Sequence, residues 1–120
     1  MIQLSQQNYV YAQIVPIDFR KGLDSLIGVC RGVLKKDPFS GAIFAFRNRK
    51  GTAIKLITYD GSGFWLMHKR FSTGTLKHWP KTASDKISGA ILMVILNQGS
   101  PGEFAKPWRP LDSSNASMAL

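Results

Sequence analysis

Basic side chains gather at two turns of this chain and continue along the strands predicted beside them. Arg47, Arg49 and Lys50 fall at the tip of a predicted hairpin, where long cationic side chains can reach phosphate oxygens or enter a groove of nucleic acid. Arg20 and Lys21 stand near the start of a predicted helix, where the helix dipole disfavours cations, and this placement indicates an anion to be bound. The sequence therefore predicts a phosphate-facing surface. Its expected residues are Arg20, Lys21, Arg47, Arg49, Lys50, Lys55, Lys69 and Arg70.

Each basic group also has an interpretation without a ligand. The hairpin tip can be a charged turn that only promotes solubility, and Arg20 and Lys21 can be exposed helix residues. Strand parity adds a constraint, because Lys69 and Arg70 are neighbours on one predicted strand and point to opposite faces. Only one of these two side chains is then expected on the fully solvated side.

Residues suited to catalysis or metal binding are sparse. Transposases and related nucleases hold two metal ions with clustered carboxylates, but the Asp residues here are spread out, and Asp18, Asp37 and Asp60 fit cap and turn roles. His68 and His78 do not have the spacing of a metal pair on a helix. The sequence therefore predicts a protein that is not an enzyme, with no catalytic residues, no metal site and no cofactor.

The single cysteine, Cys30, excludes an intramolecular disulfide and a cysteine-based zinc site, which fits a reducing cytosol. Cys30 falls on the apolar face of a predicted helix, so its thiol is expected to be buried and unreactive. The N-terminus lacks the pattern of a secretory signal, and the longest apolar stretch, residues 90–96, is far shorter than the roughly 20 residues of a membrane span. We therefore expect a cytoplasmic protein that makes no membrane contact.

The overall composition is that of one folded, basic domain. The 120 residues suffice for one hydrophobic core, and the hydrophobic fraction of 44% is typical of soluble globular proteins. Sixteen Lys and Arg residues against seven Asp and Glu residues give a formal charge of +9, which favours polyanionic partners such as nucleic acid. Net charge alone leaves open a basic protein that is merely soluble or that docks on an acidic partner.

Hydrophobic periodicity and turn signals predict where the helices and strands lie. Apolar residues at spacings of three and four predict a long helix with Asp18 as its N-cap, which ends before Pro38. A shorter helix is expected around residues 90–96, with Ser84 or Asp85 as its cap. The expected strands are residues 9–15, 42–48, 52–59, 64–71 and 75–79.

The fold class expected from these elements is α+β. It consists of an antiparallel meander sheet of four to five strands with one long N-terminal helix and one shorter C-terminal helix. Residues 1–100 would form a single domain. Residues 101–120 carry small polar residues without periodicity, and we expect an irregular or disordered C-terminal tail there.

A specific series of motifs runs through residues 15–99. It comprises Asp18, Arg20, Lys21, Gly22, Asp24, Asp37, Pro38, Phe39, Ser40, Gly41, Phe44, Phe46, Arg47, Arg49, Gly51, Lys55, Asp60, Gly61, Gly63, Lys69, Arg70, Trp79 and Pro80. In order and spacing this series resembles the small TnpB-type accessory protein of the IS-sixty-six family of bacterial insertion sequences. The resemblance implies a helper of DNA transposition that is encoded beside a separate large transposase, and it assigns no catalytic residues.

The function predicted from charge and resemblance together is that of a non-catalytic accessory protein in the transposition of a mobile element. It would bind DNA through its basic surface and assist the transposase, so DNA and the transposase are the two expected partners. The alternative is a protein-interaction module that docks on the transposase without touching nucleic acid. A third interpretation is a binder of single-stranded RNA or DNA that stacks bases on exposed Trp65 or Phe71.

Overall fold

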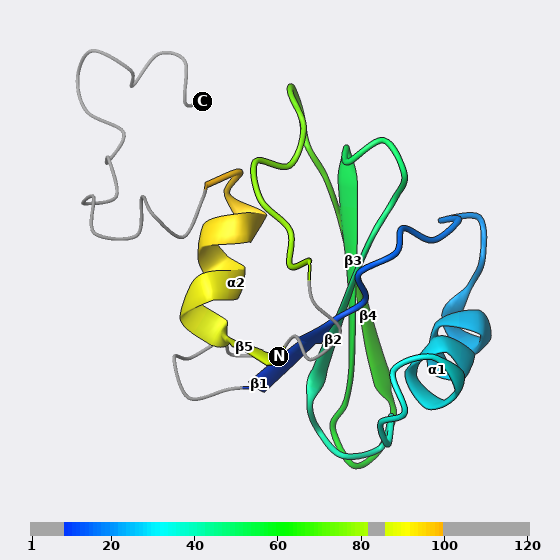
Figure 1. The fold of residues 1–120 in the computed structure, drawn as a ribbon. Coiled ribbons are helices and arrows are strands. Elements are labelled where there is room, and N and C mark those ends of the chain that lie inside the picture. Colours follow the sequence, from blue (N-terminus) through cyan, green and yellow to red (C-terminus); the bar gives the residue numbers. More distant parts are fainter. Residues whose placement is uncertain (1–8, 82–85, 100–120) are drawn as a thin grey trace.

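The computed structural model describes residues 9–81 and 86–99, which form one five-stranded sheet and two helices (Figure 1). The elements in chain order are β1 (Tyr9–Ala12), α1 (Leu23–Gly32), β2 (Ile43–Arg47), β3 (Ala53–Tyr59), β4 (Phe64–Arg70), β5 (Lys86–Ser88) and α2 (Gly89–Leu96). The tail predicted at residues 101–120 lies outside the described residues, and so do Ser84 and Asp85.

The sheet is mixed, and the predicted antiparallel meander is wrong. Its strand order is β4-β3-β2-β1-β5, with β1 parallel to β2 and every other pair antiparallel. The physical reason is the connection through α1: a helix between two strands carries the chain back to the starting edge, so the next strand runs in the same direction as the first. β1 therefore lies inside the sheet, between β2 and β5, and not at its edge.

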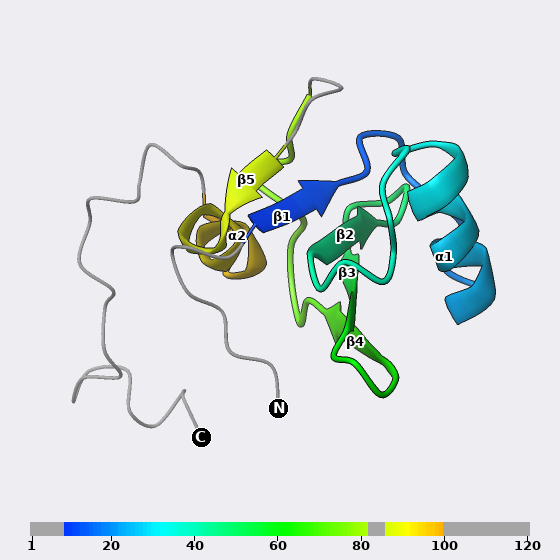
Figure 2. The same ribbon diagram turned by 90° about the horizontal axis from the view of Figure 1, so that it is seen from below.

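The two helices cover opposite faces of the sheet (Figures 1 and 2). Beneath α1, Leu26 and Cys30 pack on Phe44, Phe46 and Ile57. The face beneath α2 is a second apolar cluster, whose members are Val10, Ala12, Ile43, Ala45, Ile54, Leu56, Phe71, Trp79, Leu92 and Ile95. Alternate residues of β2 and β3 enter the two clusters, which explains why these strands are apolar on both sides and buried almost throughout.

Helix α1 is shorter than predicted, because its first turn does not form at Asp18. The N-cap is Gly22, whose extended backbone has no side-chain cap. Asp18 instead accepts hydrogen bonds from the backbone and the guanidinium of Arg20. The carbonyls of Phe19 and Lys21, which a longer helix would need as acceptors, receive hydrogen bonds from the side chain of Lys55 at 2.9 and 3.3 Å. A tertiary contact thus overrides the helical periodicity of this segment.

The C-terminal half of the sheet also differs from the prediction. Residues 75–79 form no strand; Leu76 makes one backbone hydrogen bond to Gly51, and Trp79 donates from its indole nitrogen to the carbonyl of Gln13 at 2.8 Å. The edge beside β1 is filled by the short strand β5, which the sequence did not predict. Ser88 ends β5 and caps α2 by accepting from the backbone nitrogen of Ile91.

The two hairpins β2–β3 and β3–β4 are present as predicted. In the second turn the carboxylate of Asp60 accepts from the backbone nitrogens of Ser62 and Gly63 at 2.8 and 3.0 Å. The bond from the Ser62 backbone nitrogen, with those from the Ser62 hydroxyl, the Trp65 indole and the Gly63 backbone nitrogen, lowers the pKa of Asp60 to about 2. Gly61 has a φ of 101°, which a residue with a Cβ adopts only under strain.

Two glycine substitutions test the contributions of backbone conformation. Gly28 lies on the exposed side of α1, and a Cβ there meets nothing within 4 Å; the same open space surrounds Gly61. We expect Gly28→Ala to stabilise the protein by about 0.5 to 1 kcal/mol, because alanine favours the helix and restricts the unfolded chain. Gly61→Ala is the matched control and should destabilise it by about 1 kcal/mol or more. Chemical denaturation measures both; equal effects of the two substitutions would contradict the backbone assignment.

Candidate nucleic-acid interface

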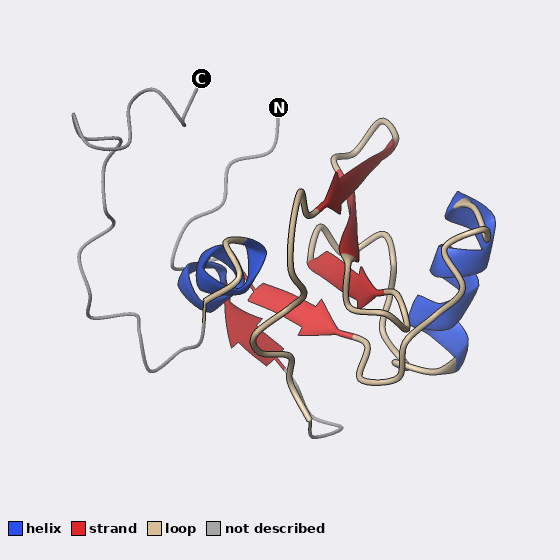
Figure 3. Cartoon of the chain, turned by 90° about the horizontal axis from the view of Figure 1, so that it is seen from above, coloured by secondary structure: helices blue, strands red, loops and turns tan. Residues whose placement is uncertain are grey.

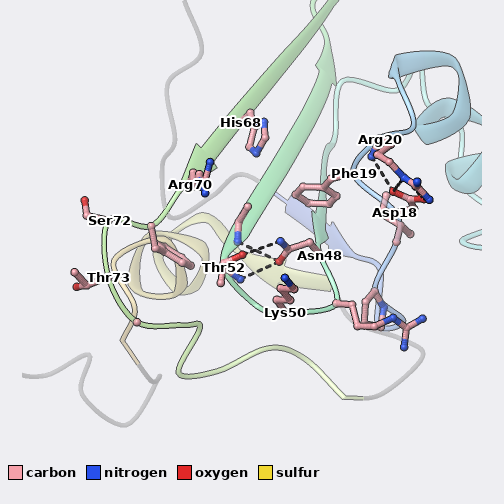
Figure 4. Close-up of a pocket in the computed structure, with 16 residues that line it drawn as sticks. Asp18, Phe19, Arg20, Asn48, Lys50, Thr52, His68, Arg70, Ser72 and Thr73 are labelled. Carbon is pink, nitrogen blue, oxygen red and sulfur yellow. Dashed lines mark hydrogen bonds and ion pairs between the residues drawn. The ribbon is translucent and has the colours of Figure 1, made fainter.

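An open groove lies on the α1 face of the sheet, beside the region that α1 leaves uncovered. Its lining residues come from three segments, 16–20, 48–53 and 68–74. Figure 4 shows Arg20 and Asp18 on one side, His68, Arg70 and Thr73 on the other, and Lys50 between them. The groove has a volume of about 1190 Å³, which exceeds the roughly 300 to 1,000 Å³ of small-molecule pockets.

Four of the predicted cations line this groove. They are Arg20, Arg49, Lys50 and Arg70, all exposed. Arg70 reaches the β2–β3 turn because the antiparallel ladder pairs it with Ala53, the first residue of β3. Between described residues, the one salt bridge of the structure joins Arg20 to Asp18 at 2.6 Å. Arg49, Lys50 and Arg70 therefore keep their full charge available to an anion.

Asp18 is the carboxylate that lines the groove. Its hydrogen bonds with the side chain and the backbone of Arg20 lower its pKa to about 2. The pKa of Arg20 is raised by the same contact. At neutral pH both groups are ionised, so Asp18 offsets the charge of Arg20 at this wall.

Polar groups that the sequence analysis did not select stand among the cations. They are Asn48, Thr52, His68, Ser72 and Thr73. Asn48 and Thr52 shape the β2–β3 turn: the side-chain oxygen of Asn48 accepts from the backbone nitrogens of Thr52 and Ala53, and its nitrogen donates to the hydroxyl of Thr52. Ser72 and Thr73 are exposed and follow β4. The turn signal at residues 72–74 was visible in the sequence, but nothing local placed it beside Lys50.

Lys55 belongs to the wall behind the groove and does not line it. Its side chain is 7% exposed, its ammonium donates to the carbonyls of Phe19 and Lys21, and it lies 4.9 Å from the centre of the Phe19 ring. These contacts attach residues 19–21 to β3. On the groove side, the Phe19 ring packs edge-on against His68, with 5.6 Å between ring centres.

The other predicted cations lie away from the groove. The guanidinium of Arg47 donates to the carbonyl of Ile14 at 2.8 Å. Lys69 points to the α2 face, opposite to Arg70 as strand parity requires, and its ammonium donates to the carbonyl of Leu96. Both residues are exposed, so the expectation that only one of them would be on the solvated side is wrong. Lys21 is exposed but is not among the lining residues.

The aromatic residues considered for base stacking have different surroundings. Phe71 is among the residues that line the groove, but it is only 8% exposed and belongs to the core. Trp65 is 42% exposed, but it lies on the α2 face, and its indole nitrogen donates to Asp60 at 2.8 Å. Neither side chain offers a free stacking surface inside the groove.

The described residues show little that is suited to covalent chemistry. Cys30 is fully buried, and desolvation raises the pKa of its thiol to about 12, so the thiol stays protonated at neutral pH. Across residues 9–81 and 86–99, no three His, Cys, Asp or Glu side chains are placed to hold a metal ion. No helix in this part of the chain has both the length and the apolar character of a membrane span.

Comparisons with known proteins assign the chain to a family. The family model described as IS66 Orf2 like protein matches residues 7–100. Uncharacterized protein y4hO of Sinorhizobium fredii is 33% identical over 112 residues, which cover 92% of this chain and 96% of that protein. Uncharacterized protein y4jC of the same organism is 37% identical over 59 residues, about half of each chain. No solved structure matches.

The matched region contains the whole described sheet, both helices and the three segments of the groove. The resemblance to the IS-sixty-six accessory protein is thereby confirmed. This chain belongs to the IS66 Orf2-like family of proteins associated with bacterial insertion sequences.

Proposed function

We propose that the groove binds the phosphate backbone of duplex DNA and that the protein thereby acts as a non-catalytic helper of a separate transposase. The observation that carries this proposal is the convergence of Arg49, Lys50 and Arg70, three exposed cations without a salt bridge to any described carboxylate, around one open groove. The proposal places the protein in the cytoplasm, where DNA of an insertion sequence is accessible.

The shape and chemistry of the groove favour an extended polyanion. Its volume is larger than a small ligand needs, and the hydroxyl-bearing residues Ser72 and Thr73 line it together with the cations. Arg, Lys, Ser and Thr side chains are common donors to phosphate oxygens. Such contacts carry no base information, so the binding would show little sequence preference.

Removing the three free cations tests the groove directly. We expect Arg49→Gln/Lys50→Gln/Arg70→Gln to weaken binding to duplex DNA and to reduce the slope of log K against log salt by about 2 to 3, since each lost phosphate contact contributes about 0.9. Fluorescence anisotropy over a salt series measures this slope.

The matched control is Lys77→Gln/Lys81→Gln/Lys86→Gln, which removes the same charge at exposed positions outside the groove. It should leave most of the slope unchanged. An equal reduction of the salt slope in the two triple variants would show that binding depends only on net charge, and would reject the groove as the binding site. Wild-type protein that co-purifies with the transposase but binds no DNA would instead support docking on the transposase alone.

Removing the negative charge of Asp18 should have the opposite effect and strengthen DNA binding. Because its pKa is about 2, the carboxylate stays charged throughout the neutral range and its effect must be removed by substitution. Asp18→Asn keeps an oxygen for the backbone nitrogen of Arg20 and releases the guanidinium, so we expect tighter DNA binding and a slope steeper by up to about 1. Weaker binding by this variant in the same salt series would contradict a phosphate site at Arg20.

The Asp18–Arg20 pair should also make the stability of the folded protein depend on pH in the acid range. A carboxyl group with a lowered pKa stabilises the folded state above its ordinary pKa, and this contribution is lost as the pH falls toward about 2. Wild-type stability should therefore decline through this acid range more than that of Asp18→Asn. Thermal unfolding over a pH series measures the difference, and parallel curves for the two proteins would contradict it.

A further inference from the structure

The outer strand β4 is an open edge of the sheet. It pairs with β3 along all seven of its residues without a bulge, and no described element lies beyond it (Figures 2 and 3). Trp65 and Leu66 are each 42% exposed on this strand. An unblocked edge with apolar side chains is a template for pairing with another strand.

The alternation of backbone hydrogen bonds along β4 determines which of its residues point their backbone N–H and C=O groups toward the free edge. Phe71 donates its backbone nitrogen to the carbonyl of Thr52, so this pair belongs to the hydrogen-bonded set of the β3–β4 ladder. Hydrogen-bonded and non-hydrogen-bonded pairs alternate along an antiparallel ladder. The residues whose backbone groups point to the free edge are therefore Phe64, Leu66, His68 and Arg70.

We propose that β4 pairs antiparallel with β4 of a second copy of this chain, about a two-fold axis at Met67. Met67 then meets its own equivalent in a non-hydrogen-bonded pair, and the outward-facing residues meet in hydrogen-bonded pairs, as the phase requires. The facing pairs are Phe64 with Arg70, Trp65 with Lys69, and Leu66 with His68, each residue taken from a different copy.

The side chains of β4 complement one another in this register. The first half of the strand is aromatic and apolar, and the second half is cationic, so pairing about Met67 places each half opposite the other. Arg70 meets Phe64, a contact that cation–π attraction favours. Lys69, whose ammonium donates to the carbonyl of Leu96 in its own copy, meets Trp65 with the aliphatic part of its side chain. The indole of Trp65 is already fixed by its hydrogen bond to Asp60, which lowers the entropic cost of docking on it.

Neighbouring registers are less favourable for physical reasons. A shift that keeps the hydrogen-bond phase moves the axis to Leu66 or to His68. The axis at His68 leaves Phe64 and Trp65 beyond β4 of the other copy and brings Lys69 diagonal to its own equivalent. The axis at Leu66 leaves Arg70 beyond the paired strand of the other copy. The register about Met67 is the one that uses all of β4.

Pairing of this kind joins two sheets into one and leaves both α1 faces on the same side. The two grooves would then open in the same direction, related by the two-fold axis. Use of both grooves by DNA rests on the proposed function, whereas the pairing itself does not, and it is tested without DNA.

Two substitutions at one exposed position test the interface in the full chain. Leu66→Lys places a cation diagonal to Arg70 of the other copy at two symmetric positions, and we expect the dimer dissociation constant to rise about tenfold. Leu66→Glu is the matched control, since a carboxylate there lies diagonal to the guanidinium of Arg70 of the other copy and should preserve the dimer. Sedimentation equilibrium at low ionic strength, where charges on the two copies are little screened, provides the measurement, with circular dichroism to confirm folding.

A cysteine cross-link tests the position of the axis independently. Met67→Cys should form a disulfide-linked dimer on mild oxidation, because facing residues of a non-hydrogen-bonded pair have Cα atoms about 4.5 Å apart. Val33→Cys, at a position that is 60% exposed near the end of α1, is the collision control and should form no disulfide-linked dimer, and the native Cys30 is buried. Wild-type protein that is monomeric up to millimolar concentration overturns the proposal, as does a dimer in which Leu66→Lys acts no more strongly than Leu66→Glu or in which Met67→Cys fails to cross-link.

Discussion

The buried ammonium of Lys55 determines the form of the candidate site. It donates hydrogen bonds to the carbonyls of Phe19 and Lys21, both more than thirty residues away in sequence, and lies against the Phe19 ring. Hydrogen bonds from a charged donor contribute about 1.5 to 3 kcal/mol each. This contact holds residues 19–21 on β3, and α1 begins only after them. One side chain thus both shortens the helix and builds a wall of the groove.

The difference between the two faces of the sheet follows from that contact. On one face α2, Trp79 and Phe71 close over the apolar residues of β1, β2 and β3. On the other face α1 covers Phe44, Phe46 and Ile57 but stops short of the end of the sheet where β3 begins. Residues 16–20, the β2–β3 turn and the end of β4 surround this uncovered end, and their cations face it.

Local signals in the sequence were sufficient to predict the two hairpins. A turn such as Asp60-Gly61 is held by its own hydrogen bonds and needs a residue that adopts a positive φ. Local signals were insufficient wherever a distant residue decides the structure. The start of α1 depends on Lys55, and the parallel direction of β1 depends on the crossover through α1. Strand β5 has three residues, too few for a periodic pattern, and its position is set by pairing with β1, which is distant in the sequence.

The candidate site was predictable in part for the same reason. Arg49 and Lys50 lie together because they share one turn, and Arg70 joins them through the register of β3 with β4. Arg47 differs from Arg49 by two residues, yet its guanidinium binds the carbonyl of Ile14, a contact that requires the parallel pairing of β1 with β2. Lys55 was expected on the phosphate-facing surface, but at 7% exposure it supports the segment that carries Arg20 and Lys21. Burial of a lysine under an aromatic ring has no signature in the sequence.

Amide hydrogen exchange in the Lys55→Met variant tests most directly whether the Lys55 ammonium holds residues 19–21 on β3. Methionine keeps the length of the side chain and removes its hydrogen-bond donors. The backbone nitrogen of Lys21 bonds to the carbonyl of Asp18 within the attached segment, so its amide should exchange at least about tenfold faster in the variant. The amides of Leu56 and Ile57 in β3 should keep their protection. Unchanged exchange at Lys21 in a folded Lys55→Met protein would contradict the claim that the ammonium holds this wall of the groove.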